Sequence, residues 1–193
     1  MDPLSIIKKY FEPGTDAHDI FLEHGTAVAE KALSIAKGLC HLNPDLSFIR
    51  EAAMLHDIGI VYVNAPGIGC HGSMPYICHG YLGRDLLEKE GYPLHALVAE
   101  RHIGTGITTD DIIGRDLPLP VRDMQPLSLE ERIICYADKF FSKMPGHLRD
   151  EKSFEQAIKD LEKFGQEKTA AFIEMQRRFS KIPFREKDLS PLQ

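Results

Sequence analysis

Apolar residues recur along most of this chain at the three- and four-residue spacing of amphipathic helices. Prolines at Pro75 and Pro93 and capping residues at Asp16 and Ser128 mark the beginnings of several such segments. Ser128 and Glu131 have the spacing of a capping box. The pattern predicts helices at residues 4–11, 16–42, from 45 or 47 to 57, 75–91, 93–103, from 128 through 138, and 153–179, the last with Gly165 as its weak point.

The segments between these helices have the composition of loops. Residues 64–72 are rich in glycine, and the long segment 104–126 combines prolines with glycines, which is typical of functional or mobile loops. No segment shows a convincing strand pattern, so we expect an all-α fold of about six to eight helices. We expect a single domain over 1–183, with its core at 20–142 and its C-terminal helix at 153–179, followed by a poorly ordered tail at 184–193.

A histidine and an aspartate, His56 and Asp57, stand side by side at the end of the third apolar run. Apolar residues share the helical face of His56, so the pair should be carried into the interior. Burying these groups costs free energy unless they are paired or bind a metal. The same conflict of polar side chains at apolar helical positions recurs in four other predicted segments, at His24, His79, His102 and Asp138. Imidazole with carboxylate suits iron, manganese, nickel or zinc, so the sequence predicts one internal metal site fed by five helices.

Composition and net charge limit the classes of partner that we expect this chain to bind. The chain has 193 residues, 43% of them hydrophobic, which is enough for one well-buried domain. A net charge of −6 argues against a surface that coats nucleic acid, although a buried dication would still attract a small anionic substrate. We find no signal peptide and no membrane-spanning stretch, and the four cysteines are dispersed. These features predict a cytoplasmic protein with reduced thiols and no membrane partner.

The order His24, His56-Asp57, Asp138 resembles the HD-domain metal-dependent phosphohydrolases, and His56-Asp57-Ile58-Gly59 resembles their HDIG subgroup. His79 and His102 resemble the additional ligands of members with two metals, and the resemblance covers roughly residues 20–142. It implies an HD-domain helical bundle around a site for two divalent transition metals, iron or manganese first, nickel or zinc next. One metal would take His24, His56, Asp57 and Asp138, and the other His79 and His102, with Asp57 bridging the two.

By the same resemblance the expected activity is hydrolysis of a nucleotide or another small phosphoester or phosphoanhydride through a metal-activated water. Asp57 is then catalytic, and Lys139 and His71 are candidates for a general acid. Substrate phosphate is expected to contact a set of basic and glycine-flanked residues, Arg84, Arg101, Thr105 and Lys139. One departure bears on this set: many relatives that cleave phosphodiesters have lysine directly after the motif, where this chain has Ile60.

Several alternatives remain open at the level of sequence. Cys70-His71 and Cys78-His79 could form a closed structural zinc site. Lys139 could simply neutralise Asp138, and the two arginines could be solvated surface charges. As alternatives to the hydrolase, a di-iron oxygenase of HD type would use the same ligands, and a nucleotide-binding regulator could retain the fold without catalysis. Substrate, metal identity and oligomeric state cannot be read from the sequence.

Overall fold

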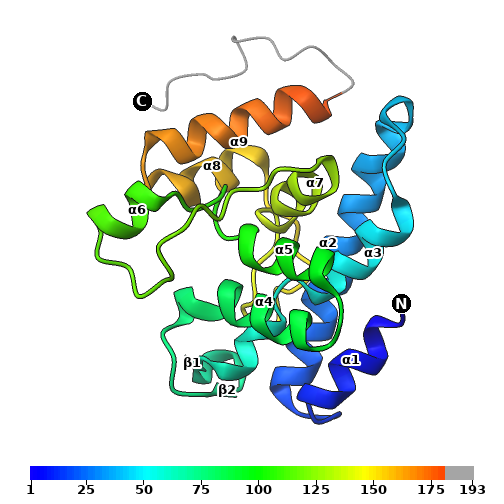
Figure 1. Ribbon diagram of the computed structural model, residues 1–193. Helices are drawn as coiled ribbons and strands as arrows, with labels where there is room; N and C mark the ends of the chain where they lie inside the picture. Colours follow the sequence, from blue (N-terminus) through cyan, green and yellow to red (C-terminus); the bar gives the residue numbers. More distant parts are fainter. Residues whose placement is uncertain (181–193) are drawn as a thin grey trace.

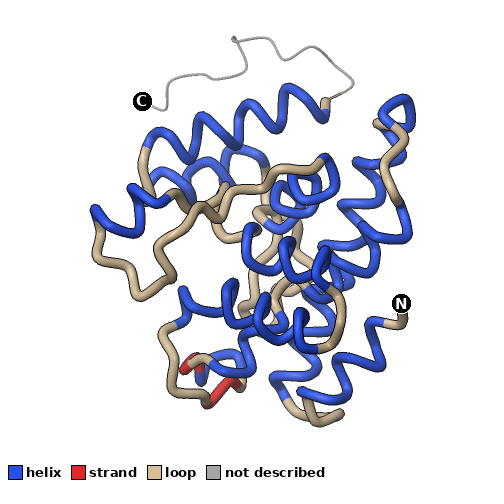
Figure 2. Tube along the Cα trace, viewed as in Figure 1, coloured by secondary structure: helices blue, strands red, loops and turns tan. Residues whose placement is uncertain are grey.

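The computed structural model describes residues 1–180. Within that range the chain forms an all-α bundle, as predicted, with a minor two-stranded hairpin (Figures 1 and 2). The helices are α1 (Pro3–Tyr10), α2 (Asp16–Gly38), α3 (Leu46–Leu55), α4 (His79–Lys89), α5 (Pro93–Arg101), α6 (Thr109–Gly114), α7 (Leu129–Asp138), α8 (Phe154–Glu162) and α9 (Gln166–Phe179). Four 3-10 helices join them: η1 (Cys40–Leu42), η2 (Ile58–Tyr62), η3 (Pro66–Ile68) and η4 (Tyr76–Cys78).

The long helix α2, which runs along one side of the molecule in Figure 1, packs against α3 and α7 around a central apolar cluster. Its inner face carries small side chains, among them Val28, Ala32 and Ala36, which are fully buried. Small residues let neighbouring helices approach closely, and Ile49 of α3 and Ile133 of α7 fill the remaining space. This packing brings the ends of α3 and α7 toward the middle of α2.

Two further apolar clusters lie on either side of this centre. One joins α1, η2 and α4 through buried residues that include Ile7, Ile60 and Leu87. The other joins α7 to α8 and α9 around the fully buried ring of Phe172. In Figure 1, α8 and α9 (orange) lie at the end of the molecule opposite the β hairpin. Both clusters hold the helix ends that surround the polar centre described below.

The structure differs from the sequence-based expectation in its short elements. Asn64–Ala65 (β1) and Cys70–His71 (β2) pair as an antiparallel hairpin within the expected glycine-rich loop. The long loop contains α6, which opens with a capping box between Thr108 and Asp111. The expected last helix is two helices, because Gly165 adopts a φ of 121° that other residues rarely tolerate. The predicted tail lies outside the described residues.

The capping box predicted at the start of α7 is half formed. The Ser128 side chain accepts a hydrogen bond from the backbone N–H of Glu131. The carboxylate of Glu131 does not return to Ser128; it accepts from the N–H of Leu127 and pairs with Arg101. Similarly, Thr15 caps α2 in place of the expected Asp16.

No helix within residues 1–180 combines the length and the apolar composition that crossing a membrane requires.

Gly59 sets the distance between η2 and α4. A Cβ at this position would lie 2.0 Å from the carbonyl oxygen of His79 and 2.5 Å from the backbone nitrogen of Gly83. Both neighbours are main-chain atoms of a packed helix, so they cannot move aside without moving α4. Only glycine therefore allows the segment after Asp57 to lie directly on the helix that begins at His79.

We predict that Gly59→Ala lowers the free energy of unfolding by about 3 kcal/mol or more, because the added methyl group forces α4 away from η2. Urea unfolding followed by circular dichroism measures the loss. Gly114→Ala is the matched control, since nothing lies within 4 Å of its Cβ position, and it should leave stability unchanged or slightly raised. Equal unfolding midpoints for the Gly59 variant and the parent chain would contradict the close approach.

A buried ion pair ties α6 to α9. The Lys168 ammonium lies 2.5 Å from Asp111 Oδ2 and also donates to the Gly106 carbonyl. Burial alone would raise the pKa of Asp111, but Lys168 and the donors of Thr108 lower it to about 2. A carboxyl group with a depressed pKa in the folded state stabilises the fold above its unfolded pKa, and this contribution disappears as the pH falls toward the folded value.

Asp111→Asn should therefore reduce the free energy of unfolding by about 1–2 kcal/mol at neutral pH. The difference from the parent chain should shrink as the pH falls from about 4 toward about 2, where Asp111 itself becomes protonated. Chemical unfolding at a series of pH values measures both quantities. The exposed neighbour Asp110 supplies the control, because Asp110→Asn should change stability little. A deficit of Asp111→Asn that stays constant down to pH 2 would refute the coupling.

Candidate metal centre

Five segments bring six polar side chains to one buried point. His24 lies in the middle of α2, His56 and Asp57 directly follow α3, and His79 begins α4. The other two are His102, directly after α5, and Asp138, the last residue of α7. All six residues are between 1% and 7% exposed. The sequence-based expectation that these helices converge is confirmed by their placement.

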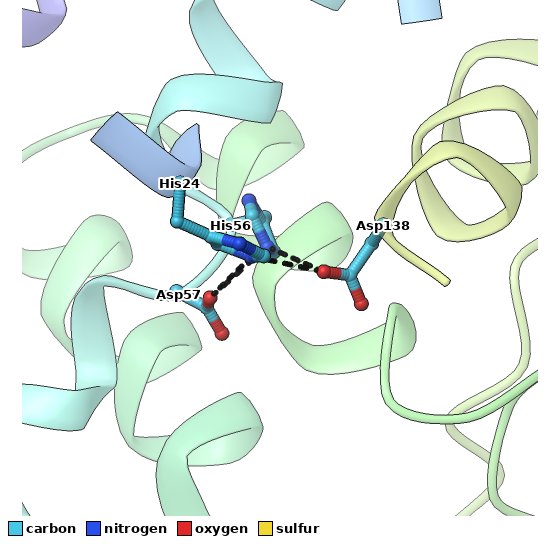
Figure 3. Close-up of side chains that lie close together, drawn as sticks. All are labelled: His24, His56, Asp57 and Asp138. Carbon is cyan, nitrogen blue, oxygen red and sulfur yellow. Dashed lines mark hydrogen bonds and ion pairs between the residues drawn. The ribbon is translucent and has the colours of Figure 1, made fainter. Parts of the chain in front are cut away.

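The first donor set contains His24, His56, Asp57 and Asp138, whose side chains point toward one another in Figure 3. His24 Nε2 lies 3.3 Å from Asp57 Oδ2 and 3.0 Å from Asp138 Oδ1. His56 Nε2 lies 3.1 Å and 3.4 Å from the same two oxygens. The four donor atoms all lie within 4.8 Å of one another, which leaves them arranged around a single common point.

The second donor set lies on the other side of Asp57. His79 Nε2 and His102 Nε2 are each 3.3 Å from Asp57 Oδ1 and 3.2 Å from each other. The two oxygens of Asp57 thus face different sets of imidazoles, Oδ2 toward the first set and Oδ1 toward the second. A carboxylate placed in this way has the geometry to bridge two adjacent ions.

Three histidines are oriented by the backbone. Nδ1–H of His56 donates to the carbonyl of Ala53 at 2.6 Å, that of His79 to Tyr76 at 2.6 Å, and that of His102 to the residue three before it at 2.8 Å. Because each bond uses Nδ1, each ring presents Nε2 to the centre. Hydrogen bonding of the remote ring nitrogen is the arrangement that metal-binding histidines usually show.

The buried charges are strongly coupled. Burial alone would raise the pKa of Asp57, but His56 and Lys143 hold it well below its usual range. Burial likewise opposes ionisation of Asp138, yet Lys139 and Lys143 keep the pKa of this carboxyl low as well. Burial would lower the pKa of His56, but the two carboxylates raise it to about 9. Both carboxylates of the first donor set therefore stay ionised, which is the form that binds a metal.

In the second donor set the histidine pKa values are lowered, in contrast to the raised pKa of His56. Burial lowers the pKa of His79 to about 3, and burial also lowers that of His102. Both rings are therefore neutral at physiological pH, which is the form that binds a metal.

In addition, His56 Nε2 and Asp57 Oδ1 are buried without a hydrogen-bond partner among residues 1–180. Such orphaned donor atoms fit a divalent metal, which would satisfy them.

A model of the HD domain matches residues 21–142, more than half of the chain. The chain belongs to the HD domain family. This region contains all six residues of the two donor sets.

Curated relatives match a large part of the chain. An uncharacterized protein of Methanocaldococcus jannaschii is 38% identical over 120 residues, which cover 61% of this chain and 63% of that protein. The tRNA (cytidine(56)-2'-O)-methyltransferase of Thermoplasma volcanium is 31% identical over 72% of this chain and 35% of the enzyme. Its counterpart from Picrophilus torridus is 30% identical over 66% of this chain and 33% of the enzyme. The chain thus spans less than two thirds of each relative, and no solved structure gives a significant match.

A cavity of about 340 Å³ opens beside the HD-domain centre. His79, His102 and Asp138 reach its wall, which also contains Asp160, several apolar side chains and four lysines: Lys139, Lys143, Lys152 and Lys163. Lys143 Nζ is 2.7 Å from Asp57 Oδ2, and Lys139 Nζ is 2.6 Å from Asp138 Oδ2. The lysines place positive charge at the mouth of the centre in a chain whose net charge is −6.

Lys139 combines the two roles weighed from the sequence, since it neutralises Asp138 and also lines the cavity. Lys143 was missed, because it follows the helix in a segment that resembles an exposed turn, Lys143-Met144-Pro145-Gly146. Its position four residues after Lys139 was the available signal, since residues four apart share a face whenever a helical turn continues.

The two arginines expected to bind substrate have structural partners instead. Arg84 pairs with Glu100, a side chain only 1% exposed, at 2.6 Å, and Arg122 pairs with the same carboxylate. Arg101 donates to both oxygens of Glu131 at 3.0 and 3.1 Å. Neither Arg84 nor Arg101 borders the cavity beside the centre. The expectation rested on closeness in sequence to His79 and His102, whereas the structure places both arginines against buried glutamates.

Thr105 and His71 also lie away from the centre. Thr105 is buried, and its hydroxyl donates to the carbonyl of Lys168, whereas the adjacent backbone of Gly104 borders the cavity. His71 lies exposed on β2, paired with Asn64, and does not line the cavity. The structure therefore gives neither side chain a contact with the centre.

The alternative of a structural zinc site is not supported. The thiols of Cys70 and Cys78 face the carbonyls of Ile68 and Pro118, and neither cysteine belongs to a cluster of metal-competent groups within residues 1–180. His79 belongs to the second donor set instead. Ile60, the departure from the lysine of many relatives, is fully buried in the apolar cluster around η2, so no charge reaches the centre from that position.

We predict that the protein binds close to two divalent transition metals per chain and that His79→Ala combined with His102→Ala removes one of them. The first donor set keeps its four groups in this variant, so one metal should remain. Elemental analysis of protein purified without chelator measures the stoichiometry. His41→Ala is the control, because His41 is exposed and belongs to neither donor set. Unchanged metal content in the double variant would show that the second set holds no ion.

Proposed function

We propose that this HD-domain protein is a metal-dependent phosphohydrolase that acts on a small phosphoester or phosphoanhydride. The observation that carries the proposal is the junction of two donor sets, shared through Asp57, with a cavity lined by four lysines. Ammonium groups around a cavity favour an anion, and the imidazole–carboxylate sets favour transition metals rather than magnesium or calcium.

In this proposal His24, His56, Asp57 and Asp138 hold one metal, and Asp57, His79 and His102 hold the other. Iron or manganese are the first candidates, followed by nickel or zinc. Bound dications would lower the pKa of a water molecule and neutralise charge on the phosphoryl oxygens. The HDIG assignment of the His56–Gly59 motif belongs to the same proposal.

The lysines orient the substrate. Lys139 and Lys143 each hold one oxygen of a buried carboxylate and line the cavity, so their ammonium groups also face an anion within it. Burial opposes their charge, but the carboxylates keep the pKa values of both lysines above the usual range. Both therefore stay positively charged at neutral pH and act as fixed cations rather than as general acids. Lys163 extends the positive surface outward, whereas Lys152 pairs with Asp160 of the same wall at 2.6 Å.

The names of the methyltransferase relatives do not transfer to this chain. The matches cover 35% and 33% of those enzymes, so most of each has no counterpart here. A substrate related to RNA, such as a terminal phosphate, is consistent with the proposal and belongs in any substrate panel. A cytoplasmic location likewise remains part of the proposal, and nucleotides belong in the same substrate panel.

The decisive experiment measures phosphate release under strict anaerobiosis by protein loaded with manganese or nickel. A hydrolase needs only charge stabilisation and an activated water, so these ions should support turnover of at least one nucleotide, sugar phosphate, aryl phosphate or terminally phosphorylated RNA. Asp57→Asn keeps the size of the side chain and removes its charge, and it should reduce turnover by at least about 100-fold. This variant also controls for a contaminating phosphatase.

The same substrates are then tested with iron-loaded protein in air while oxygen uptake is followed. Oxygen consumption coupled to an organic substrate, with no phosphate released by any metal form, would replace the hydrolase with a di-iron oxygenase. Nucleotide binding without turnover in every metal form would point to a regulator.

A further inference from the structure

The cavity beside the centre has a second branch of different character. A space of about 390 Å³ runs away from the lysines, and its walls are mainly Ile77, Ile103, Ile107 and Leu117. The two branches share a set of residues at their junction, Tyr76, His79, Ile103, Gly104 and Phe164. His79 belongs to the second donor set and borders both branches, so a ligand bound at this set would lie next to each of them.

The polar residues of the apolar branch are already paired. Lys168 is held by Asp111 and by the carbonyl of Gly106. Arg115 donates to the carbonyl of Phe164 at 2.5 Å and lies 3.8 Å from Asp111. Asp111 and Lys168 are thus paired with each other, Arg115 uses one of its N–H groups on a carbonyl, and the other walls are mainly isoleucine, leucine and aromatic side chains. A ligand therefore finds apolar surface there and few free hydrogen-bonding groups.

This character bears on the kind of molecule that fits. A nucleobase or a sugar carries several donors and acceptors, and burying them without partners costs about 1–3 kcal/mol each. A hydrocarbon or aryl group has no such groups and gains from leaving water. The volume of the branch lies within the ~300–1,000 Å³ typical of sites for small molecules.

We propose that the natural substrate is a phosphoester of an apolar alcohol, with its phosphate among the lysines and its hydrocarbon or aromatic group in the apolar branch. This inference rests on the proposed phosphohydrolase function and names the class of substrate. It replaces the nucleotide expected from the sequence, because a nucleoside would bring unsatisfied polar groups into this branch.

The test measures binding, so it does not depend on turnover. Manganese-loaded full-length protein is titrated by calorimetry with phosphonates, whose carbon–phosphorus bond resists hydrolysis. The probes are naphthylmethylphosphonate, hydroxyethylphosphonate and the phosphonate analogue of adenosine monophosphate, together with naphthylmethanol, which lacks the anion. We expect the naphthyl phosphonate to bind at least tenfold more tightly than each of the other three.

Variants locate the two groups of the ligand. Leu117→Asn introduces polarity into the apolar branch, and Ile77→Trp fills it without adding charge; each should weaken the naphthyl phosphonate at least fivefold and change hydroxyethylphosphonate less than twofold. Ile113→Asn is the matched control, because Ile113 lies exposed on α6 outside the branch and should change neither affinity. Lys143→Met should weaken all three phosphonates and leave naphthylmethanol unaffected.

The outcomes separate this inference from the function on which it rests. If the adenosine and naphthyl phosphonates bind equally well and the branch variants change neither, the apolar substrate is wrong and the phosphohydrolase still stands. If naphthylmethanol binds as tightly as its phosphonate and Lys143→Met has no effect, the lysines do not bind the phosphate group. Both the apolar substrate and the phosphohydrolase function are then wrong.

Discussion

The buried carboxylate of Asp57 is the group on which the arrangement of this chain depends. An ionised carboxylate that is 2% exposed is stable only among donors and positive charges. Here one oxygen faces His24 and His56, the other faces His79 and His102, and Lys143 approaches the first. These partners come from four helices and from the segment after α7. Satisfying one side chain therefore requires the central helices to converge, which links the stability of the fold to the composition of the site.

The backbone around Asp57 shows how the convergence is achieved. Neighbouring residues of a continuous α-helix point about 100° apart, yet His56 and Asp57 both face the same donors. Helix α3 ends at Leu55, and Asp57 leaves helical geometry with φ −98° and ψ 8° before η2 begins. Gly59 then lets η2 lie against the backbone of α4, which brings His79 to the second oxygen of Asp57. The segment His56–Gly59 thus supplies two candidate metal ligands and also marks the change from the α-helix α3 to the 3-10 helix η2.

The sequence supported the prediction of the donor sets and of the all-α fold, because a histidine on an apolar helical face conflicts with its surroundings in a way that periodicity reveals. No such signal in the sequence indicated which basic residues line the cavity. Arg84 is five positions after His79, and five residues rotate a helix by about 140°, so the arginine faces Glu100. Lys143 and Lys163 reach the cavity from a loop and from the end of α8, through contacts between distant segments. Two local signals were available but were not used to divide longer predicted elements. The pairing of Thr108 with Asp111 begins α6 within the predicted long loop, and Gly165 divides the predicted last helix into two.

The lysines make part of the cavity wall positive, although the chain as a whole has a negative net charge. The distance of each charge from the cavity decides which of the two a ligand there would experience. Charges farther away than a Debye length of about 8 Å are largely screened at physiological salt, whereas Lys139 and Lys143 touch the carboxylates of the centre. Lys152, Lys163, Phe164 and Lys168 contribute to the two branches, yet they lie beyond the matched HD-domain region at 21–142. One part of the cavity wall is therefore built by segments beyond the region that defines the family, whereas the apolar branch is built mostly within that region.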